Sequence, residues 1–238
     1  MNSAVVFGSS GSIGNALVLL LAEKYPKAII YSVSRFKKDY TQKNINHLCV
    51  DYFDEVDLHA IRQTVTKSGP LDLVLVSNGV LHNDSIKPEK SLKDISIENI
   101  QNSFKINTIL PTLLLKHFMS ALNRKDKSIF AVLSARVGSI SDNRLGGWYG
   151  YRASKSALNM MIKTASIEAK RSNKSAIVVG LHPGTVNSKL SKPFQKNISP
   201  EKVMLPNKSA EHLLSVLISL SCKDSGKCFA WDGEEILP

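Results

Sequence analysis

Short apolar runs and amphipathic stretches alternate along the 238-residue chain. The apolar runs are strand-length and bounded by glycine, proline or polar residues, as in buried strands. They lie at 4–7, 28–33, 47–50, 71–76, 128–133, 176–181 and 228–231. Helical spacing is found at 15–23, 95–122, from about residue 151 onward, and at 209–221. This alternation predicts an α/β fold, a doubly wound parallel sheet, in a single domain covering residues 1–238.

The first apolar run leads into a glycine-rich turn and then into a helix. The turn contains Gly8, Gly11, Ser12, Ile13 and Gly14. Glycines let the backbone bend tightly and approach a phosphate, and the free amides at the start of a helix face the anion. Flanked by a strand and a helix, the turn predicts a dinucleotide site; an isolated glycine motif would indicate only a flexible turn.

The second run ends at Ser34-Arg35, where the ribose of a dinucleotide would lie. A carboxylate at this position would bind a free 2′-hydroxyl and repel a 2′-phosphate. Ser34 and Arg35, with neighbouring Lys37, favour the phosphate, so NADP(H) is the preferred cofactor, with NAD(H) as the alternative. A solvated loop cation is the other interpretation of Arg35.

The third and fourth runs end at Asp51 and at Ser77-Asn78-Gly79, on the edge of a parallel sheet where ligands bind. Asp51 is either an adenine contact or a helix cap. Asn78 and Gly79 are expected to line the cofactor, with Gly79 letting backbone pass close to it.

The segment Gly146–Lys155 carries a phenol and an ammonium four residues apart near a predicted helix start. Tyr151 and Lys155 therefore share a helix face. A nearby ammonium favours the phenolate, so the sequence predicts a lowered pKa for Tyr151 and a role in general acid–base catalysis. A chance Tyr-x-x-x-Lys is the competing explanation, which the surrounding site must exclude.

Three further sets of polar residues lie at strand ends or inside an apolar helix. Asn107 has a structural role near Pro111 or holds a water near the site. Hydroxyls after the fifth run, Ser134 and Ser139, could donate to a developing oxyanion. Pro183, Gly184 and Thr185 end the sixth run, with Thr185 placed to bond a cofactor. His182 has no nucleophile elbow to serve, which disfavours a catalytic histidine.

Composition and charge limit the partners and the cellular location that we expect. The formal charge of +11 is dispersed along the chain, without the aromatic-interleaved basic segment of a nucleic-acid binder. Cys49, Cys222 and Cys228 indicate neither a disulfide framework nor a zinc site, and no metal is expected. With no secretory signal or spanning segment recognised, the expectation is a cytoplasmic protein without membrane or nucleic-acid partners.

Taken together, the glycine turn, Ser77-Asn78-Gly79, Asn107, the serine-bearing strand end, Tyr-x-x-x-Lys and Pro-Gly-Thr resemble the classical short-chain dehydrogenases/reductases. SARVGSI, GGWYGYRASKSALN, LHPGTV and FAWDG are similar to the branch of C-factor-like proteins and sniffer-type carbonyl reductases. The resemblance implies a Rossmann fold and a homodimer or homotetramer. It also implies roles for individual residues: Tyr151 as proton donor, Lys155 as its partner and ribose ligand, Asn107 in a proton relay, Gly8, Ile13 and Gly14 at the pyrophosphate, Arg35 at the 2′-phosphate, Asp51 at the adenine, and Gly79 and Thr185 along the cofactor.

Two departures from the family pattern affect these roles. Ser12 replaces the middle glycine of the turn, while Gly11 precedes it. Ala135 occupies the position of the family's catalytic serine, so Ser134 is the candidate substitute, with Ser139 as the alternative. Losing one oxyanion donor costs about two to three orders of magnitude in rate.

The sequence therefore predicts an NADP(H)-dependent oxidoreductase that interconverts a carbonyl and an alcohol on a small molecule. The alternative is a cofactor-binding sensor with vestigial catalysis, motivated by Ala135. Substrate selection is expected from residues 81–90 and from the proline-rich segment 186–206, predicted to be mobile and to cover a pocket.

Overall fold

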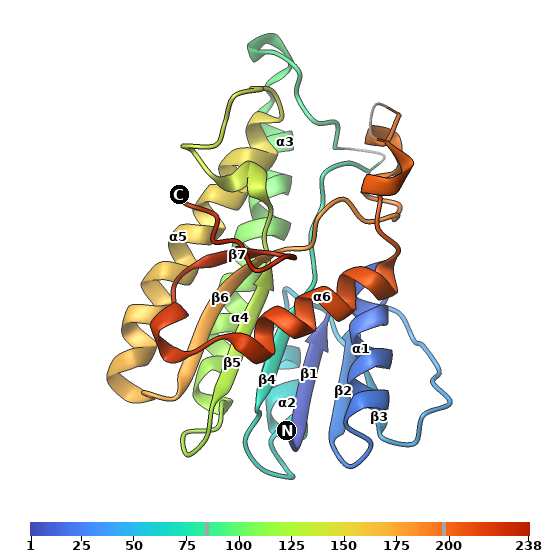
Figure 1. Cartoon of the computed structure of the whole chain (residues 1–238), viewed down its shortest axis with the longest axis vertical. Coiled ribbons are helices and arrows are strands. Elements are labelled where there is room, and N and C mark those ends of the chain that lie inside the picture. The colour runs from blue at the N-terminus through green and yellow to red at the C-terminus, as the bar shows by residue number, and fades with distance from the viewer. Residues whose placement is uncertain (84–85, 197–198) are drawn as a thin grey trace.

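The computed structural model contains one parallel sheet with strand order β3-β2-β1-β4-β5-β6-β7 (Figure 1). It describes residues 1–83, 86–196 and 199–238. The strands are β1 Ser3–Phe7, β2 Ile29–Ser34, β3 Ile45–Cys49, β4 Leu73–Val76, β5 Ser128–Leu133, β6 Ala176–His182 and β7 Cys228–Ala230. Chain order reverses between β1 and β4, which is the switch point where doubly wound sheets bind ligands. The predicted fold class is confirmed.

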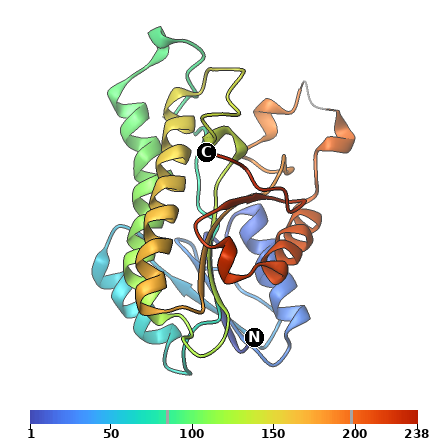
Figure 2. The same cartoon turned by 60° about the vertical axis from the view of Figure 1, so that its left-hand side comes forward.

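Helices cover both faces of the sheet (Figure 2). The helices are α1 Ser12–Lys24, α2 Glu55–Val65, α3 Ile97–Phe104, α4 Leu110–Phe118, α5 Tyr149–Ser172 and α6 Pro206–Ser219. Alternate residues of each strand supply the two cores. In β1, Val5 and Phe7 pack with α2, α4 and α5, whereas Ala4 and Val6 pack with α1 and α6. Because both faces are buried there, the central strands β1, β4 and β5 are almost continuous apolar runs, whereas the edge strand β3 is partly exposed.

Helix boundaries differ from the sequence expectation in three places. Helix α1 begins at Ser12, inside the glycine turn rather than at Asn15. Helix α2 was not predicted. The predicted helix 95–122 is divided into α3 and α4 by a π-helical turn, Lys105–Ile109. Pro111 has no backbone N–H and cannot donate to the Asn107 carbonyl, which accounts for the break just before it.

The described residues of segment 186–206 include short 3₁₀ turns at Lys192–Phe194 and Pro200–Lys202, and Pro206 begins α6. Positions 197 and 198 of this predicted covering segment, and 84 and 85 of the predicted 81–90 region, lie outside the described residues. Within the described ranges, no helix has both the length and the apolar character needed to cross a bilayer.

Candidate active site

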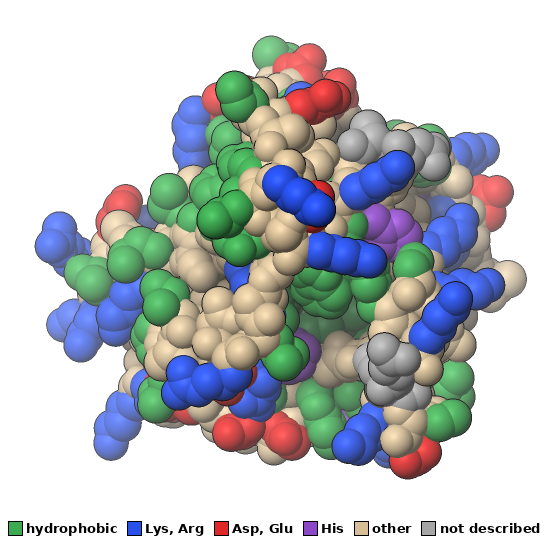
Figure 3. Space-filling model, turned by 90° about the horizontal axis from the view of Figure 1, so that it is seen from above, with side chains coloured by type: hydrophobic (Ala, Val, Ile, Leu, Met, Phe, Trp, Pro, Cys, Tyr) green, Lys and Arg blue, Asp and Glu red, His purple; other side chains and the backbone are tan. Residues whose placement is uncertain are grey.

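A cavity of about 820 Å³ opens at the carboxyl ends of β1, β4, β5 and β6. Seen from that edge, the hollow has hydrophobic side chains in its floor and Lys and Arg side chains around it (Figure 3). Twelve of the predicted site residues line it: Gly11, Ser12, Ile13, Gly14, Asn78, Gly79, Ser134, Tyr151, Lys155, Pro183, Gly184 and Thr185. Gly8, Ser34, Arg35, Asp51 and Asn107 lie outside the lining.

The glycine turn brings the start of α1 against the end of β4. Gly8 adopts φ +75°, and its N–H donates to the Tyr52 hydroxyl at 2.9 Å. A Cβ on Gly14 would stand 2.4 Å from Ser77 Oγ and 2.5 Å from the Gly8 carbonyl oxygen, so only glycine fits. Gly11 has an ordinary φ of −73° and more room. Gly8 and Gly14 therefore carry the close approach, and Ser12 is accommodated as the first residue of α1.

The polar groups of this turn fit a dinucleotide. The N-cap residue of α1, Gly11, supplies no side-chain hydrogen bond, so the first amides of the helix point toward the cavity without a side-chain cap. Asn78 Oδ1 is buried and has no hydrogen-bond partner within the described chain. A cradle of close backbone and an unpartnered acceptor are what a bound nucleotide would engage.

At the end of β2 the structure presents cations. Arg35 is exposed, with its guanidinium 5.6 Å from the centre of the Phe36 ring. Lys38, which the sequence analysis did not single out, donates from Nζ to Asn15 Oδ1 on α1. Ser34 Oγ donates to the Phe36 carbonyl at 2.7 Å. Among the described residues, Arg35 and Lys38 form no ion pair with a carboxylate, which leaves both charges available to an anion.

Asp51 was predicted as an adenine contact or a helix cap. Its Oδ1 accepts from the Phe53 N–H at 3.1 Å, forming a local turn. The cap of α2 is Asp54 instead, which accepts from the Val56 N–H at 2.8 Å. Asp51 is exposed, and a role at the adenine stays a prediction.

Tyr151 and Lys155 lie one turn apart on α5 and both line the cavity. Lys155 is 3% exposed; its Nζ donates to the Leu133 carbonyl at 2.9 Å and lies 6.0 Å from the centre of the Tyr151 ring. Burial lowers the pKa of Lys155 to about 8. Burial also raises the pKa of Tyr151 to about 12. The predicted lowering of the Tyr151 pKa was wrong for this structure, because desolvation of the phenol outweighs the attraction of a distant ammonium.

Asn107 lies in the π-helical turn and is fully buried. Its side chain accepts from the Val80 N–H at 2.8 Å and donates to the Val80 carbonyl at 2.9 Å and to Ser154 Oγ at 3.1 Å. These bonds join the loop after β4 to α5. A Cβ on Gly79 would be 3.6 Å from both Asn107 Oδ1 and Lys155 Nζ, so the amide lies close to the cationic end of the pair.

The hydroxyls next to Ala135 have other partners. Ser134 Oγ donates to Asn159 Oδ1 at 2.7 Å, and Ser139 Oγ accepts from the Asp142 N–H at 3.1 Å. Ala135 lines the cavity, as does Ser134, whereas Ser139 is not among the lining residues. The methyl group of Ala135 thus stands in the lining where the family pattern has a hydroxyl. A catalytic role for Ser134 stays a prediction.

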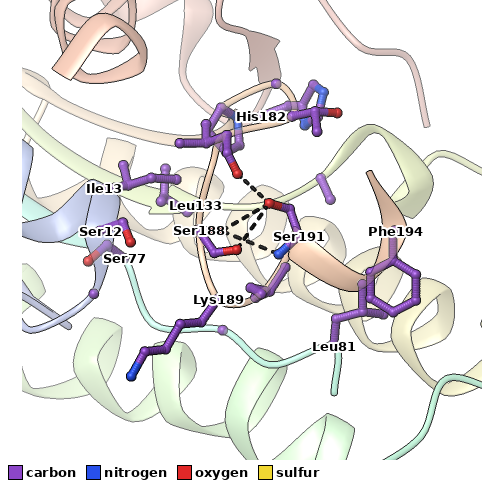
Figure 4. Close-up of a pocket in the computed structure, with 18 of the residues that line it drawn as sticks. Ser12, Ile13, Ser77, Leu81, Leu133, His182, Ser188, Lys189, Ser191 and Phe194 are labelled. Carbon is purple, nitrogen blue, oxygen red and sulfur yellow. Dashed lines mark hydrogen bonds between the residues drawn. The ribbon is translucent and has the colours of Figure 1, made fainter. Parts of the chain in front are cut away.

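One end of the cavity is lined by aromatic side chains, which the sequence motifs did not predict. Figure 4 shows the Phe194 ring at this end, on the same side as Leu81. The Trp148 ring lies 6.2 Å from the Tyr151 ring and 5.0 Å from the Phe194 ring, centre to centre. His82 Nε2 is 3.1 Å from both the Lys189 and Leu190 carbonyls, which ties segment 186–196 to the loop after β4. Residues distant in sequence build this wall; the pair Gly146-Gly147 before Trp148 was the one local signal of an unusual turn.

His182 lines the cavity beside Pro183. Burial lowers the pKa of His182 to about 4, so its ring is neutral at neutral pH. Within the described residues, no cluster of three or more His, Cys, Asp or Glu side chains is arranged to hold a metal ion.

The sheet order, the glycine cradle at the switch point and the Tyr–Lys pair beside it define a Rossmann-type dinucleotide-binding domain. Residues 2–199 match the family model for short chain dehydrogenases, and the chain belongs to this family of oxidoreductases. The resemblance inferred from the motifs is confirmed.

Individual relatives agree with this assignment. C-signal of Myxococcus xanthus is 27% identical over 169 residues, which cover 71% of this chain and 93% of the relative. The NADPH-bound carbonyl reductase from chicken fatty liver superposes with a TM-score of 0.83 at 23% identity, covering 100% of this chain and 99% of the other. The carbonyl reductase Sniffer of D. melanogaster gives 0.84 at 21% identity over the full length of both chains. At these identities the two structures establish the fold alone.

Proposed function

We propose that this protein is an NADP(H)-dependent oxidoreductase that interconverts a carbonyl and an alcohol on a small molecule. The observation that supports it most is the placement of Tyr151 and Lys155 in the lining of the same cavity as the glycine turn. A chance Tyr-x-x-x-Lys would not bring both side chains to the switch point of the sheet. The NADPH-bound chicken carbonyl reductase shares this fold, which supports the choice of cofactor class.

In this proposal Tyr151 donates its proton to the substrate oxygen during reduction and takes it back during oxidation. The phenol is protonated at neutral pH, as an acid must be, and its raised pKa makes it a weaker donor than a free tyrosine. Lys155 orients the site through its bond to the Leu133 carbonyl, and Asn107 fixes the neighbouring loop through both polar groups of Val80. When bound, the dinucleotide supplies the hydride.

The aromatic wall of Trp148 and Phe194, together with Leu81, favours an apolar or aromatic carbonyl compound at the substrate end. Arg35 and Lys38 would hold the 2′-phosphate, and Ser12, Ile13 and Gly14 the pyrophosphate. Pro183, Gly184 and Thr185 would contact the nicotinamide end.

The test is to mix purified protein with NADPH and a panel of aldehydes, ketones and quinones, and to follow NADPH absorbance. We expect turnover by the natural chain, and a loss of about 10²- to 10⁴-fold in kcat in Tyr151→Phe with NADPH affinity retained. If Tyr151→Phe turns over as fast as the natural chain, the assignment of the proton donor fails.

The second candidate function is a cofactor-binding sensor with vestigial catalysis. Ala135 in the cavity lining favours it, since the neighbouring Ser134 hydroxyl is bonded to Asn159. Tight NADPH binding without oxidation of NADPH by any panel member, with a protein partner whose affinity changes with NADPH, would support this candidate over the first.

A homodimer or homotetramer is part of the proposal. Apolar side chains exposed along α3, α5 and the π-helical turn, including Ile97, Ile109, Met160 and Ile167, support it. Light scattering coupled to size-exclusion chromatography measures the mass directly, and a monomer at micromolar concentration would contradict it.

A further inference from the structure

A buried acidic residue holds the start of the helix that carries Tyr151. Glu89 is 2% exposed and comes from the segment after β4, about 60 residues before α5 in the sequence. Its main-chain carbonyl accepts from the Trp148 N–H at 2.5 Å, and its side-chain Oε2 accepts from the Gly150 N–H at 3.1 Å. One residue therefore binds two of the three residues that immediately precede Tyr151.

Helix α5 needs such an external partner. Its N-cap residue, Trp148, makes no side-chain cap bond and has φ +53°, the one positive φ among the described non-glycine residues. A left-handed tryptophan persists only where its surroundings hold it, and the first amides of a helix need acceptors. The negative Glu89 side chain also lies at the positive end of the helix dipole, which offsets the cost of burying it.

The space around the carboxyl group is closely fitted to glycine. A Cβ on Gly150 would lie 2.9 Å from Glu89 Oε1 and 3.4 Å from Ser103 Oγ. Oε1 itself is buried without a hydrogen-bond partner in the described chain, so the Gly150 amide is what the side chain is placed to meet. The contact fixes where the backbone of residue 150 stands, and hence where Tyr151 begins.

We propose that the Glu89 side chain is a positioning group: its bond to the Gly150 N–H, next to the main-chain bond to Trp148, sets the start of α5 and with it Trp148 and Tyr151 in the cavity. The Trp148 ring contacts both the Tyr151 and Phe194 rings, so its placement also orients the aromatic wall. The effect on turnover rests on the proposed function, because it requires Tyr151 to be the proton donor. The effect on the position of Trp148 does not depend on the proposed function.

The kinetic test compares Glu89→Ala, Glu89→Gln and Asp54→Ala in the full chain. Each is assayed with NADPH and a carbonyl compound of the panel that the natural chain reduces. Asp54 is the matched control, since it too is a carboxylate bonded to a helix amide, at α2 and outside the cavity lining. We expect Glu89→Ala to lower kcat at least tenfold while the Kd for NADPH stays within threefold. Glu89→Gln keeps an acceptor for Gly150 and is expected to stay within threefold of the natural kcat, as is Asp54→Ala.

The proposal is overturned if Glu89→Ala retains kcat within twofold, or if Glu89→Gln loses as much as Glu89→Ala. Should Glu89→Ala not fold, Gly150→Ala replaces it, because the added methyl group displaces the carboxyl group without removing its charge. We then expect the same tenfold loss of kcat; a Gly150→Ala protein with natural kcat would contradict the proposal.

A second readout needs no turnover. The chain has two tryptophans, so Trp231→Phe leaves Trp148 as the single fluorescent reporter. In that background Glu89→Ala removes the Gly150 bond and keeps the main-chain bond to Trp148. Because Gly150 is two residues from Trp148 at the same helix start, we expect the Trp148 emission to shift to longer wavelength and its quenching constant with acrylamide to at least double. Asp54→Ala should leave both unchanged. If the natural chain oxidises no NADPH but Glu89→Ala produces this shift, the proposed function fails and the positioning role stands. An unchanged emission overturns the positioning role itself.

Discussion

The two halves of the cavity are shaped by different parts of the chain. In the half proposed to bind the nucleotide, which is the turn Gly8–Gly14 with Asn78, backbone atoms set the shape. In the half proposed to be catalytic, side chains set it: Ala135, Trp148, Tyr151, Lys155 and Phe194. In the first half the fit depends on the absence of a Cβ, and the identity of Ser12 matters little because its side chain belongs to the first turn of α1. In the second half, the proposed role of each residue depends on its own side-chain group, such as the phenol of Tyr151 or the ammonium of Lys155. This difference predicts that the first half tolerates changes in side-chain chemistry but not added volume, whereas the second half depends on the identity of individual side chains.

Among the substitutions that compare the two halves, Ala135→Ser should have the largest effect, because it adds a hydroxyl where the cavity lining has a methyl group. We expect kcat for carbonyl reduction to rise by about 10²-fold, the size of effect that one oxyanion donor has elsewhere. Stopped-flow or steady-state NADPH oxidation measures it. NADPH affinity should not change, since the substitution leaves the nucleotide half intact.

Ser134→Ala is the companion to this experiment. If Ser134 already supplies the missing donor, its removal lowers kcat by a similar factor and Ala135→Ser adds little. Because its hydroxyl donates to Asn159, we expect Ser134→Ala to change kcat less than threefold. A large loss would restore Ser134 as the family serine's substitute.

The nucleotide half was predictable because its signals are local. A strand, a glycine turn and a helix follow one another within 24 residues, and Gly8 and Gly14 act on neighbours that the parallel sheet brings together in a known way. The seven strands were predicted within about two residues at each end, since most are continuous apolar runs; the edge strand β3, which contains Asn46 and His47, is the exception. The unpredicted α2 has the acidic residues Glu55 and Asp57 in its first turn and buries Leu58, Ile61 and Val65.

The next prediction concerns the catalytic half alone: the free energy of unfolding should depend on pH through the buried ammonium of Lys155. Its pKa is about 8 in the folded protein against 10.5 for an ordinary lysine. Below pH 8 both states hold the proton, and burial of the ammonium is a full cost. Between pH 8 and 10.5 the unfolded state binds more protons, so folding stability rises with pH.

We expect the free energy of unfolding of the natural chain to gain about 2 kcal/mol over Lys155→Met between pH 7 and 9.5, from 1.36 kcal/mol per pKa unit. Urea unfolding at each pH measures it, and the difference from Lys155→Met cancels the other titrating groups. The raised pKa of Tyr151 acts only above pH 10, with the opposite sign. A pH-independent difference would mean that Lys155 is not desolvated.

Gly14→Ala probes the nucleotide half with a single added methyl group. That group would lie 2.4 Å from Ser77 Oγ and 2.5 Å from the Gly8 carbonyl oxygen, so the start of α1 must shift. We expect a loss of stability on the order of 1.5 kcal/mol, as for overpacking in a core, and a Kd for NADPH about tenfold higher. Calorimetry of NADPH binding and thermal melts measure the two effects.

Gly11→Ala is the matched control for Gly14→Ala. Its Cβ would lie 3.3 Å from the Gly8 carbonyl oxygen and its φ suits any residue, so stability and NADPH affinity should stay near the natural values. Equal effects at both glycines would show that the close approach is not confined to Gly14.

The catalytic half was only partly predictable. Tyr151 and Lys155 were found because four residues on a helix define a face, but desolvation reversed the expected direction of the Tyr151 pKa. The bonds that hold this half are long-range: Glu89 to Gly150, Asn107 to Val80, and His82 to the Lys189 carbonyl. No periodicity or local motif encodes such pairs, and the π-helical turn at Asn107 arises from Pro111 four residues further on.

Arg35→Ser should have the smallest effect, because Arg35 lies outside the cavity lining and is exposed, so solvent screens its charge. We expect the Kd for NADPH to rise about fivefold with little change for NADH, which is the size of an exposed charge pair rather than a buried one. Calorimetric titration with each dinucleotide at 0.15 M ionic strength measures the ratio. Lys27→Ser removes the same charge at the opposite end of β2, so it controls for the general effect of net charge on an anionic ligand. If Arg35→Ser and Lys27→Ser weaken NADPH binding equally, Arg35 is not what makes the chain prefer NADPH to NADH. Lys38, which is bonded to Asn15, then becomes the residue to substitute.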